Sequence, residues 1–376
     1  MSGSGMGGEN RLNYIDFARG IGIILVILGH ISYLSEASRI FIVSFHMPLF
    51  FVISGLLIYM KKEEERDLGD TVKRKAKRMM VPYYIYSAVG ILIYFVYYLL
   101  TGRDGGIPTV ISDIVETLTL YGYSVMWFLP AIFGAEILFI WLLKKTRIPL
   151  VLTVILTAIA MVLNVFLEQA NAVHGQQSVF SVFHLIAVML LRIPVCASFT
   201  AAGYYISKAW DKTGSLGPGR FSKLTVPADI FIGVDLLILT WVISRINSVT
   251  DLHYLIFNNV FFYYIAAIAG SFGVLLLGKA LEGAMDTPPL KLIRYFGKNS
   301  LIIMVTHLNF YVLLCAEIGG FHFTKGMPEG GVTHLLFMTL VMIFTLCGEV
   351  VLIEVINRVK TRTLISRLRR QLPPKK

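Results

Sequence analysis

The chain has 376 residues, of which 56% are hydrophobic and 15% are charged. This apolar fraction exceeds that of ordinary soluble domains, so the composition excludes a soluble enzyme or binding module and indicates a protein that crosses a membrane several times. The formal net charge of +11 arises from basic residues collected in one set of loops, so it does not indicate nucleic-acid binding.

Ten apolar runs are long enough to cross a bilayer, since a spanning helix needs about 17 to 25 mostly apolar residues. They cover residues 17–35, 40–60, 80–101, 124–143, 149–168, 180–207, 228–246, 254–278, 299–317 and 333–357. The expected fold class is therefore an all-α polytopic membrane protein with about ten transmembrane helices. Pro48 should kink the second run, and Pro194 either splits or tilts the sixth.

The distribution of Lys and Arg predicts the topology. With ten spans, both chain ends lie on one side of the membrane. If that side is the cytoplasm, the cytoplasmic segments hold 28 of the 34 Lys and Arg residues, and the outer loops hold only Arg39, Arg103, Arg245 and Lys325. Because cytoplasmic loops are enriched in Lys and Arg, we expect both termini in the cytoplasm. The protein is also expected in the inner, cytoplasmic membrane.

A single membrane domain is expected over residues 11–357, because the pieces between spans are too short to fold alone. Residues 1–10 resemble an expression scar or a disordered start. Residues 358–376 form a basic cytoplasmic tail, which suits contact with anionic membrane lipids.

The first apolar run, IDFARGIGIILVILGHISYL, contains Arg19 and His30. A charged side chain inside a membrane is costly, so it indicates a function or a partner. At about 100° per residue, a separation of eleven residues brings both side chains onto one helix face, about 16 Å apart along the axis. Asp16 lies on that face too. It could pair structurally with Arg19 or orient its guanidinium group for a ligand.

Two histidines are expected at the same depth, because the first two spans run antiparallel. His30 and His46 each lie about 20 Å from the cytoplasmic end of their helix, so they could meet. An imidazole can take or give a proton near neutral pH, which makes His30 a candidate base for activating a hydroxyl group. His46 could instead serve only as a hydrogen bonder between helices.

A cationic cluster is expected at the cytoplasmic end of these helices. Lys75 and Arg78, with Arg74 adjacent, precede the third run and should lie near Arg19. Such a cluster suits a phosphorylated ligand, because guanidinium groups bind phosphate oxygens in pairs. The alternative is that these side chains reach out to lipid headgroups.

Other polar residues fall inside the expected spans. Ser54 and Gly55 follow Pro48, and the glycine would allow a backbone or a ligand to come close. Glu136 and Arg192 carry opposite charges and should pair if their helices touch, while the role of His307 stays open. No metal is expected, since the sequence has no HExxH motif, no paired cysteines and no local carboxylate–histidine cluster.

Five blocks, in order and over nearly the whole chain, resemble the acyltransferase-3 family of integral membrane acyltransferases. They are YIDFARG…LGH with the basic-x10-His spacing of Arg19 and His30, HMPLFFVISG (46–55), RKAKRMMVPY, the WFL element at Trp127, and FGKNSLIIMVTH ending at His307. The family's arginine pair spaced three apart is met here by Lys75 and Arg78, which puts one arginine role in doubt.

The resemblance implies transfer of an acyl group, commonly acetyl from acetyl-CoA, to a hydroxyl of a saccharide, a lipid-linked saccharide or another cell-envelope acceptor. The coenzyme A phosphates would meet Arg19, Lys75 and Arg78, with Arg74 adjacent. His30 would act as general base, or less favourably carry the acyl group, while His46 and Ser54 orient the reacting groups.

Two alternatives belong to other classes of protein. A transporter or flippase for an envelope saccharide would use His30, Glu136 and Arg192 as a proton relay. A membrane sensor or accessory subunit is disfavoured, because the ionisable residues converge on one face.

Overall fold

The structure is a computed structural model that describes residues 12–102, 105–174, 178–212, 225–328 and 330–371. Within these ranges, nine helical segments are long and apolar enough to cross a membrane. They are Asn13–His30, Glu36–Met60, Leu68–Thr101, Ser124–Lys145, Pro149–Val173, Ser181–Lys212, Val226–Asn247, Val260–Ala280 and Gly331–Val359. The expected all-α polytopic fold is confirmed.

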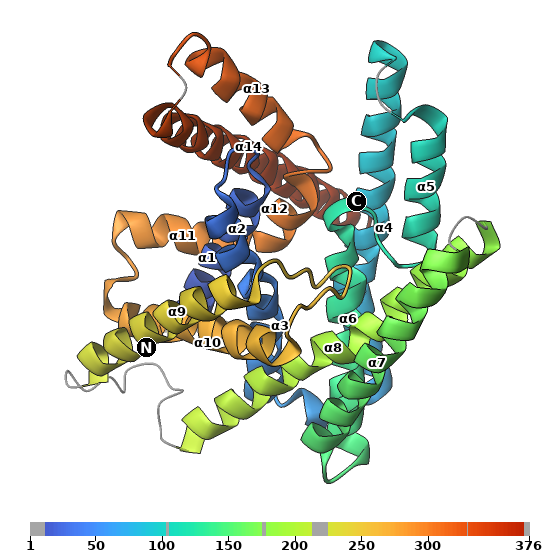
Figure 1. Ribbon diagram of the computed structural model, residues 1–376, viewed down its shortest axis with the longest axis vertical. Coiled ribbons are helices and arrows are strands. Elements are labelled where there is room, and N and C mark those ends of the chain that lie inside the picture. Colours follow the sequence, from blue (N-terminus) through green and yellow to red (C-terminus); the bar gives the residue numbers. More distant parts are fainter. Residues whose placement is uncertain (1–11, 103–104, 175–177, 213–224, 329, 372–376) are drawn as a thin grey trace, which may run out of the picture.

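Two helices occupy the centre of the bundle. Figure 1 shows α1 (Asn13–His30) and α3 (His46–Met60), in blue, surrounded by the later helices. α3 packs against α1, α8 (Ser178–Lys212) and α10 (Val260–Ala280). The sequence of α3 is apolar on every side, and such a helix has no face to give to water. Its neighbours therefore cover most of it.

The second expected span is broken near its middle. α2 (Glu36–Val43) ends two residues before α3 begins, and Ser44 and Phe45 connect them. Pro48 lies in the first turn of α3, where a backbone N–H has no partner within the helix. The break therefore occurs where the proline was expected to kink the chain. α8, in contrast, continues through Pro194 and is not split.

The prediction of one continuous helix over residues 299–317 is wrong. The chain forms α12 (Ser300–Thr306), then a turn, then α13 (Val312–Thr324). Tyr311 adopts a left-handed conformation with φ of 59°, which an α-helix cannot accommodate. Because the turn comprises residues 307–311, His307 lies at a helix end and not in the middle of a span.

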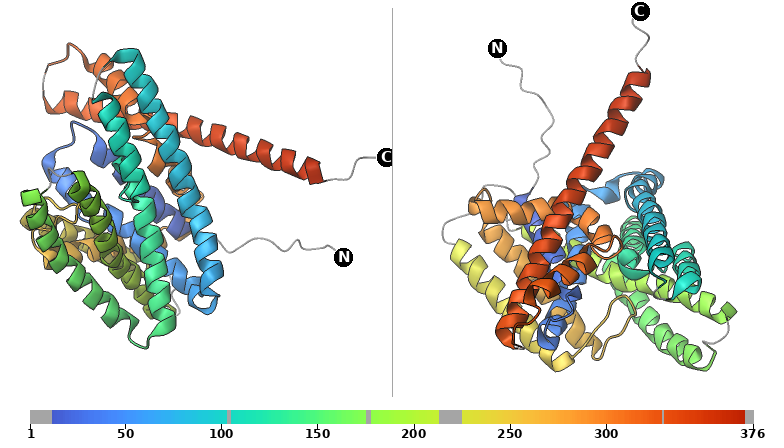
Figure 2. Two further views of the ribbon diagram at one scale, coloured as in Figure 1. Left: turned by 90° about the vertical axis from the view of Figure 1, so that its right-hand side faces the viewer. Right: turned by 90° about the horizontal axis from the view of Figure 1, so that it is seen from above.

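The remaining helices surround this centre. α4 (Leu68–Thr101) joins the basic segment before Pro82 and the third span in one helix, and α5 (Gly106–Leu118) packs beside it. The others are α6 (Phe128–Lys145), α7 (Pro149–His174), α9 (Thr225–Asn247), α11 (Pro288–Lys298) and α14 (Gly331–Gln371). Figure 2 shows the last part of α14 projecting away from the bundle.

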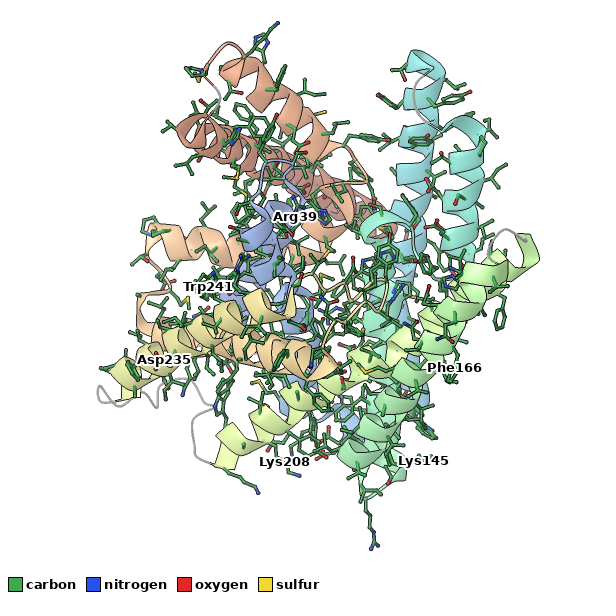
Figure 3. The ribbon with its side chains drawn as sticks, in the orientation of Figure 1. Arg39, Lys145, Phe166, Lys208, Asp235 and Trp241 are labelled. Atoms are coloured by element: carbon green, nitrogen blue, oxygen red, sulfur yellow. The ribbon has the colours of Figure 1, made fainter. Side chains whose placement is uncertain are left out.

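Peripheral helices carry apolar side chains on their outer faces, as lipid contact requires. Phe166 on α7 is 62% exposed and Trp241 on α9 is 53% exposed, and both are labelled in Figure 3. The expected basic tail, residues 358–376, continues α14 as far as Gln371. The expected scar at residues 1–10 lies outside the described residues.

Candidate active site

Arg19 and His30 lie on one uninterrupted helix, α1, whose last residue is His30. At 1.5 Å per residue, their separation corresponds to about 16 Å along the axis. Each lines a different cavity. Arg19 lines a cavity of about 360 Å³, called the Arg19 cavity below, and His30 lines one of about 470 Å³, called the His30 cavity.

The Arg19 cavity is strongly basic. Seven cationic side chains and two carboxylates line it, which gives a formal net charge of +5. The cations are Arg19, Lys61, Arg66, Arg74, Lys75, Arg78 and Lys298, and the carboxylates are Glu63 and Glu136. A concave site with this excess of positive charge attracts anions and suits phosphate groups.

The carboxylates hold two of these cations in place. The Lys75 ammonium nitrogen lies 2.7 Å from a Glu136 carboxylate oxygen and 3.9 Å from one of Glu63. Arg74 donates to Glu63, which belongs to the short helix Glu63–Glu65. Lys75 is 9% exposed, whereas Arg78 is exposed at the cavity wall. The predicted cationic cluster thus forms, with an acidic framework that sequence reasoning missed.

The predicted pairing of Glu136 with Arg192 is wrong. Their helices, α6 and α8, do pack together, but Glu136 binds Lys75 from α4. Arg192 donates instead to the backbone carbonyl oxygens of Tyr121 and His253. Glu136 therefore lines the Arg19 cavity, whereas Arg192 lies behind residues that line the His30 cavity.

Ser54 and Gly55 on α3 have different surroundings. Ser54 lines the Arg19 cavity, and its hydroxyl donates to the Phe51 carbonyl oxygen at 2.9 Å. A Cβ atom at Gly55 would lie 1.8 Å from the Thr200 carbonyl oxygen on α8. Gly55 was expected to let either a backbone or a ligand come close. The structure shows a backbone, because the absence of a side chain at Gly55 lets α3 and α8 pack closely.

The His30 cavity is lined by polar and aromatic side chains from four separate parts of the chain. These are His30, His46, Glu116, Tyr121, Ser124, Trp127, Asp251, His253 and Tyr254. His30 and His46, expected at the same depth, line this one cavity. Aromatic faces together with carboxylates are a combination that suits a polyhydroxylated ligand, because the faces pack on C–H groups and the carboxylates accept from hydroxyls.

Two histidines beside His30 have a defined tautomer. The Nδ1 atoms of His46 and His307 lie 2.8 Å from the carbonyl oxygens of Ile42 and Ile303. A carbonyl oxygen only accepts, so each neutral ring carries its proton on Nδ1 and leaves Nε2 as an acceptor. The ring centroids of His30 and His307 are 5.5 Å apart. His307 is fully buried behind His30.

Arg39 fixes the end of α1 that carries His30. It lies on α2 and is labelled in Figure 3. Its guanidinium group donates to the carbonyl oxygens of Gly29 and Ile31, the latter at 3.0 Å. The last carbonyls of a helix lack partners within the helix, so a cation there is favourable. Asp16, at the other end of α1, is 2% exposed.

Met304 lies between the two cavities. This α12 side chain lines both of them and is 3% exposed. A molecule that entered the Arg19 cavity would therefore approach the His30 cavity at Met304.

Sequence reasoning missed the loop between α9 and α10, which supplies Asp251, His253 and Tyr254. Asp251 accepts from the His253 backbone N–H at 2.7 Å, a turn typical of aspartate. Burial raises the pKa of Asp251, and burial and the charge of Arg192 lower the pKa of His253 to about 2. A cluster of Asp, His and Tyr in an outer loop was the available signal.

Comparison with known families gives one match. A family model described as an acyltransferase domain, that of the acyltransferase-3 family, matches residues 12–354. No curated protein and no solved structure matches the chain.

Proposed function

Because the chain belongs to the acyltransferase-3 family and is a multi-pass membrane acyltransferase, we propose that it moves an acetyl group from acetyl-CoA to a hydroxyl of a saccharide or other cell-envelope acceptor. One observation carries this proposal. A single helix presents Arg19 to a basic cavity and His30 to an aromatic one, and the two cavities share Met304.

The Arg19 cavity is the proposed donor site. Its net charge of +5 complements the phosphates of coenzyme A. Arg19 and Arg78 would bind phosphate oxygens through their guanidinium forks, while Lys75 and Arg74, held by the carboxylates, add positive potential. The excess of Lys and Arg in one set of loops places this cavity on the cytoplasmic side of the membrane. The membrane in this proposal is the inner one.

The reach of the donor supports this placement. The pantetheine arm of coenzyme A extends roughly 15 to 20 Å from the phosphates to the sulfur atom, an estimate from chain reach. That length is similar to the distance along α1 from Arg19 to His30, about 16 Å. A thioester whose phosphates are bound near Arg19 would therefore arrive near Met304 and His30.

The His30 cavity is the proposed acceptor site. The acceptor hydroxyl oxygen attacks the thioester carbonyl carbon while His30 takes the hydroxyl proton. The new C–O bond forms, the C–S bond breaks, and coenzyme A leaves as a thiolate that then takes up a proton. His46, with its proton fixed on Nδ1, would orient the reacting groups at the cavity, and Ser54 would do so from the Arg19 side.

Direct transfer is proposed in preference to an acyl-histidine intermediate. Aromatic and acidic side chains line the same cavity as His30, so a hydroxyl acceptor could bind beside the base. One base and two bound substrates then suffice for the reaction.

The test uses purified protein in nanodiscs, acetyl-CoA labelled in its acetyl group, and polysaccharide extracted from envelopes of cells that lack the protein. Acetylated saccharide, detected by mass spectrometry and removed by mild base, would support an O-acetyltransferase. Movement of saccharide across proteoliposomes without acetyl-CoA consumption would support a transporter instead.

A further inference from the structure

Arg192 occupies an unusual position behind the His30 cavity. Its side chain is fully buried in α8, at 0% exposure. Its hydrogen bonds go to backbone carbonyl oxygens and not to a carboxylate. A buried guanidinium group is costly unless it is well hydrogen-bonded, so its partners indicate what it is for.

The guanidinium group ties two separate segments together. Its Nε and Nη2 atoms both donate to the His253 carbonyl oxygen, at 3.0 and 2.6 Å. Its Nη1 atom donates to the Tyr121 carbonyl oxygen at 3.1 Å. Tyr121 follows α5, whereas His253 lies in the loop between α9 and α10. Three donors in a rigid fork make this bridge, and a lysine ammonium group could not reproduce it.

The same group supports the aromatic wall of the cavity. The Arg192 Cζ atom lies 5.0 Å from the Tyr121 ring centroid and 5.1 Å from that of Trp127, within cation–π range. The rings of Trp127 and His253 stack, with centroids 5.1 Å apart and an interplanar angle of 9°. Arg192, Tyr121, Trp127 and His253 are therefore one packed unit, called the Arg192 unit below.

Two tight backbone turns, at residues 121–127 and 251–256, lie next to the Arg192 unit. Gly122 has φ of 79°, and a Cβ atom there would lie 2.4 Å from the Trp127 backbone nitrogen, so the turn between Tyr121 and Trp127 requires glycine. In the other segment, Asp251 and Ile256 exchange backbone hydrogen bonds at 2.9 and 2.8 Å. Both segments are thus tight turns whose inward-facing carbonyl oxygens meet Arg192.

We propose that Arg192 is a positioning residue that holds the acceptor-binding wall of the His30 cavity, formed by Tyr121, Trp127 and His253, without itself contacting substrate. This inference rests on the proposed function. It assigns Arg192 to recognition of the saccharide acceptor and not to the donor site or to a proton relay. Loss of Arg192 should therefore weaken use of the acceptor while leaving coenzyme A binding intact.

The principal experiment compares wild type with Arg192→Lys and Arg192→Gln. The probes are acetyl-CoA and polysaccharide extracted from envelopes of cells that lack the protein, assayed in nanodiscs. We expect KM for the polysaccharide to rise about 10- to 100-fold, the loss that follows when hydrogen bonds from a buried charge are removed. The dissociation constant for coenzyme A should stay within about twofold of wild type, because the Arg19 cavity is untouched.

Lys279→Met is the matched control. Lys279 is also a buried cation against an aromatic ring, 7% exposed and 5.5 Å from the Trp210 centroid, but it lies outside both cavities. If Arg192 were only a core residue, Arg192→Lys and Lys279→Met would both lower stability. Neither would then change the ratio of the KM for the polysaccharide to the dissociation constant for coenzyme A. That result, or an unchanged acceptor KM in a folded Arg192→Lys protein, would overturn the proposal.

Hydrogen–deuterium exchange gives a readout independent of activity. Arg192→Lys should speed exchange in residues 119–127 and 248–257 while leaving α3 protected, and unchanged exchange there would overturn the proposal. If the Arg192 variants do not fold, His253→Ala, which keeps the backbone carbonyl but removes the stacked ring, should raise the acceptor KM; a wild-type value would count against the Arg192 unit. Failure of the proposed function looks different, since wild type would then give no acetylated product.

Discussion

The imidazole rings of His30 and His307 lie 5.5 Å apart between centroids, although one ends α1 and the other follows α12. His307 donates its Nδ1 proton to the Ile303 carbonyl oxygen, and its Nε2 atom has no hydrogen-bond partner among the described residues. The Nε2 lone pair of His307 thus lies near the proposed base. When His30 takes the proton of the saccharide hydroxyl, this lone pair would stabilise the imidazolium that forms on His30.

His307→Phe should therefore lower kcat for acetyl transfer about 10- to 100-fold, less than the loss of a general base itself, because His307 acts through His30. His307→Gln should retain more activity, because its amide can place an acceptor near the position of Nε2. Steady-state kinetics on both variants, with coenzyme A affinity as the folding check, measures this. A kcat for His307→Phe at or above that of His307→Gln would contradict the role of the lone pair, because only the phenylalanine variant keeps the ring volume.

The Lys75–Glu136 pair should behave as a buried ion pair. Lys75→Met would leave the Glu136 carboxylate buried without its 2.7 Å partner, and breaking such a pair typically costs about 3 to 5 kcal/mol. The double variant Lys75→Met/Glu136→Leu should recover most of that loss, because neither charge remains. Thermal unfolding in detergent compares wild type, Lys75→Met, Glu136→Leu and the double variant, and additive losses in the double variant would contradict the pairing.

The contact between α3 and α8 should tolerate no side chain at Gly55. A Cβ atom there would lie 1.8 Å from the Thr200 carbonyl oxygen, so Gly55→Ala must push the helices apart. Overpacking of this kind costs about 1 to 3 kcal/mol.

Gly283→Ala is the control for this substitution, since a Cβ atom there would have nothing within 4 Å. Differential scanning calorimetry should give a lower Tm for Gly55→Ala and a Tm near that of wild type for Gly283→Ala. Similar melting temperatures for the two variants would mean that the helix contact adapts.

Much of the site follows from local sequence. Arg19 and His30 share an uninterrupted helix, so spacing alone predicted their separation, and the basic residues before Pro82 form the cluster expected of them. The break in the second span followed from one proline, because the fixed φ and missing N–H of proline act locally.

The failures arose where distant segments decide the outcome. Glu136 had two possible cationic partners, and only the packing of α4 against α6 selects Lys75 over Arg192. The turn at residues 307–311 lies inside an apolar run, so hydropathy could not reveal it. The loop carrying His253 lines the His30 cavity, and Arg192, far away in sequence, binds its backbone there.

The central claim is that donor binding and proton transfer occur at opposite ends of α1. Arg19→Ala should weaken coenzyme A binding about tenfold or more, since charge-assisted hydrogen bonds to a phosphate are lost.

The most direct measurement is therefore a paired assay on His30→Ala in nanodiscs: isothermal titration of coenzyme A, followed by acetyl transfer from acetyl-CoA to the envelope polysaccharide. The account predicts coenzyme A affinity within about twofold of wild type and a fall in transfer rate of about 100-fold or more, as expected for loss of a general base. Wild-type transfer by His30→Ala would contradict it.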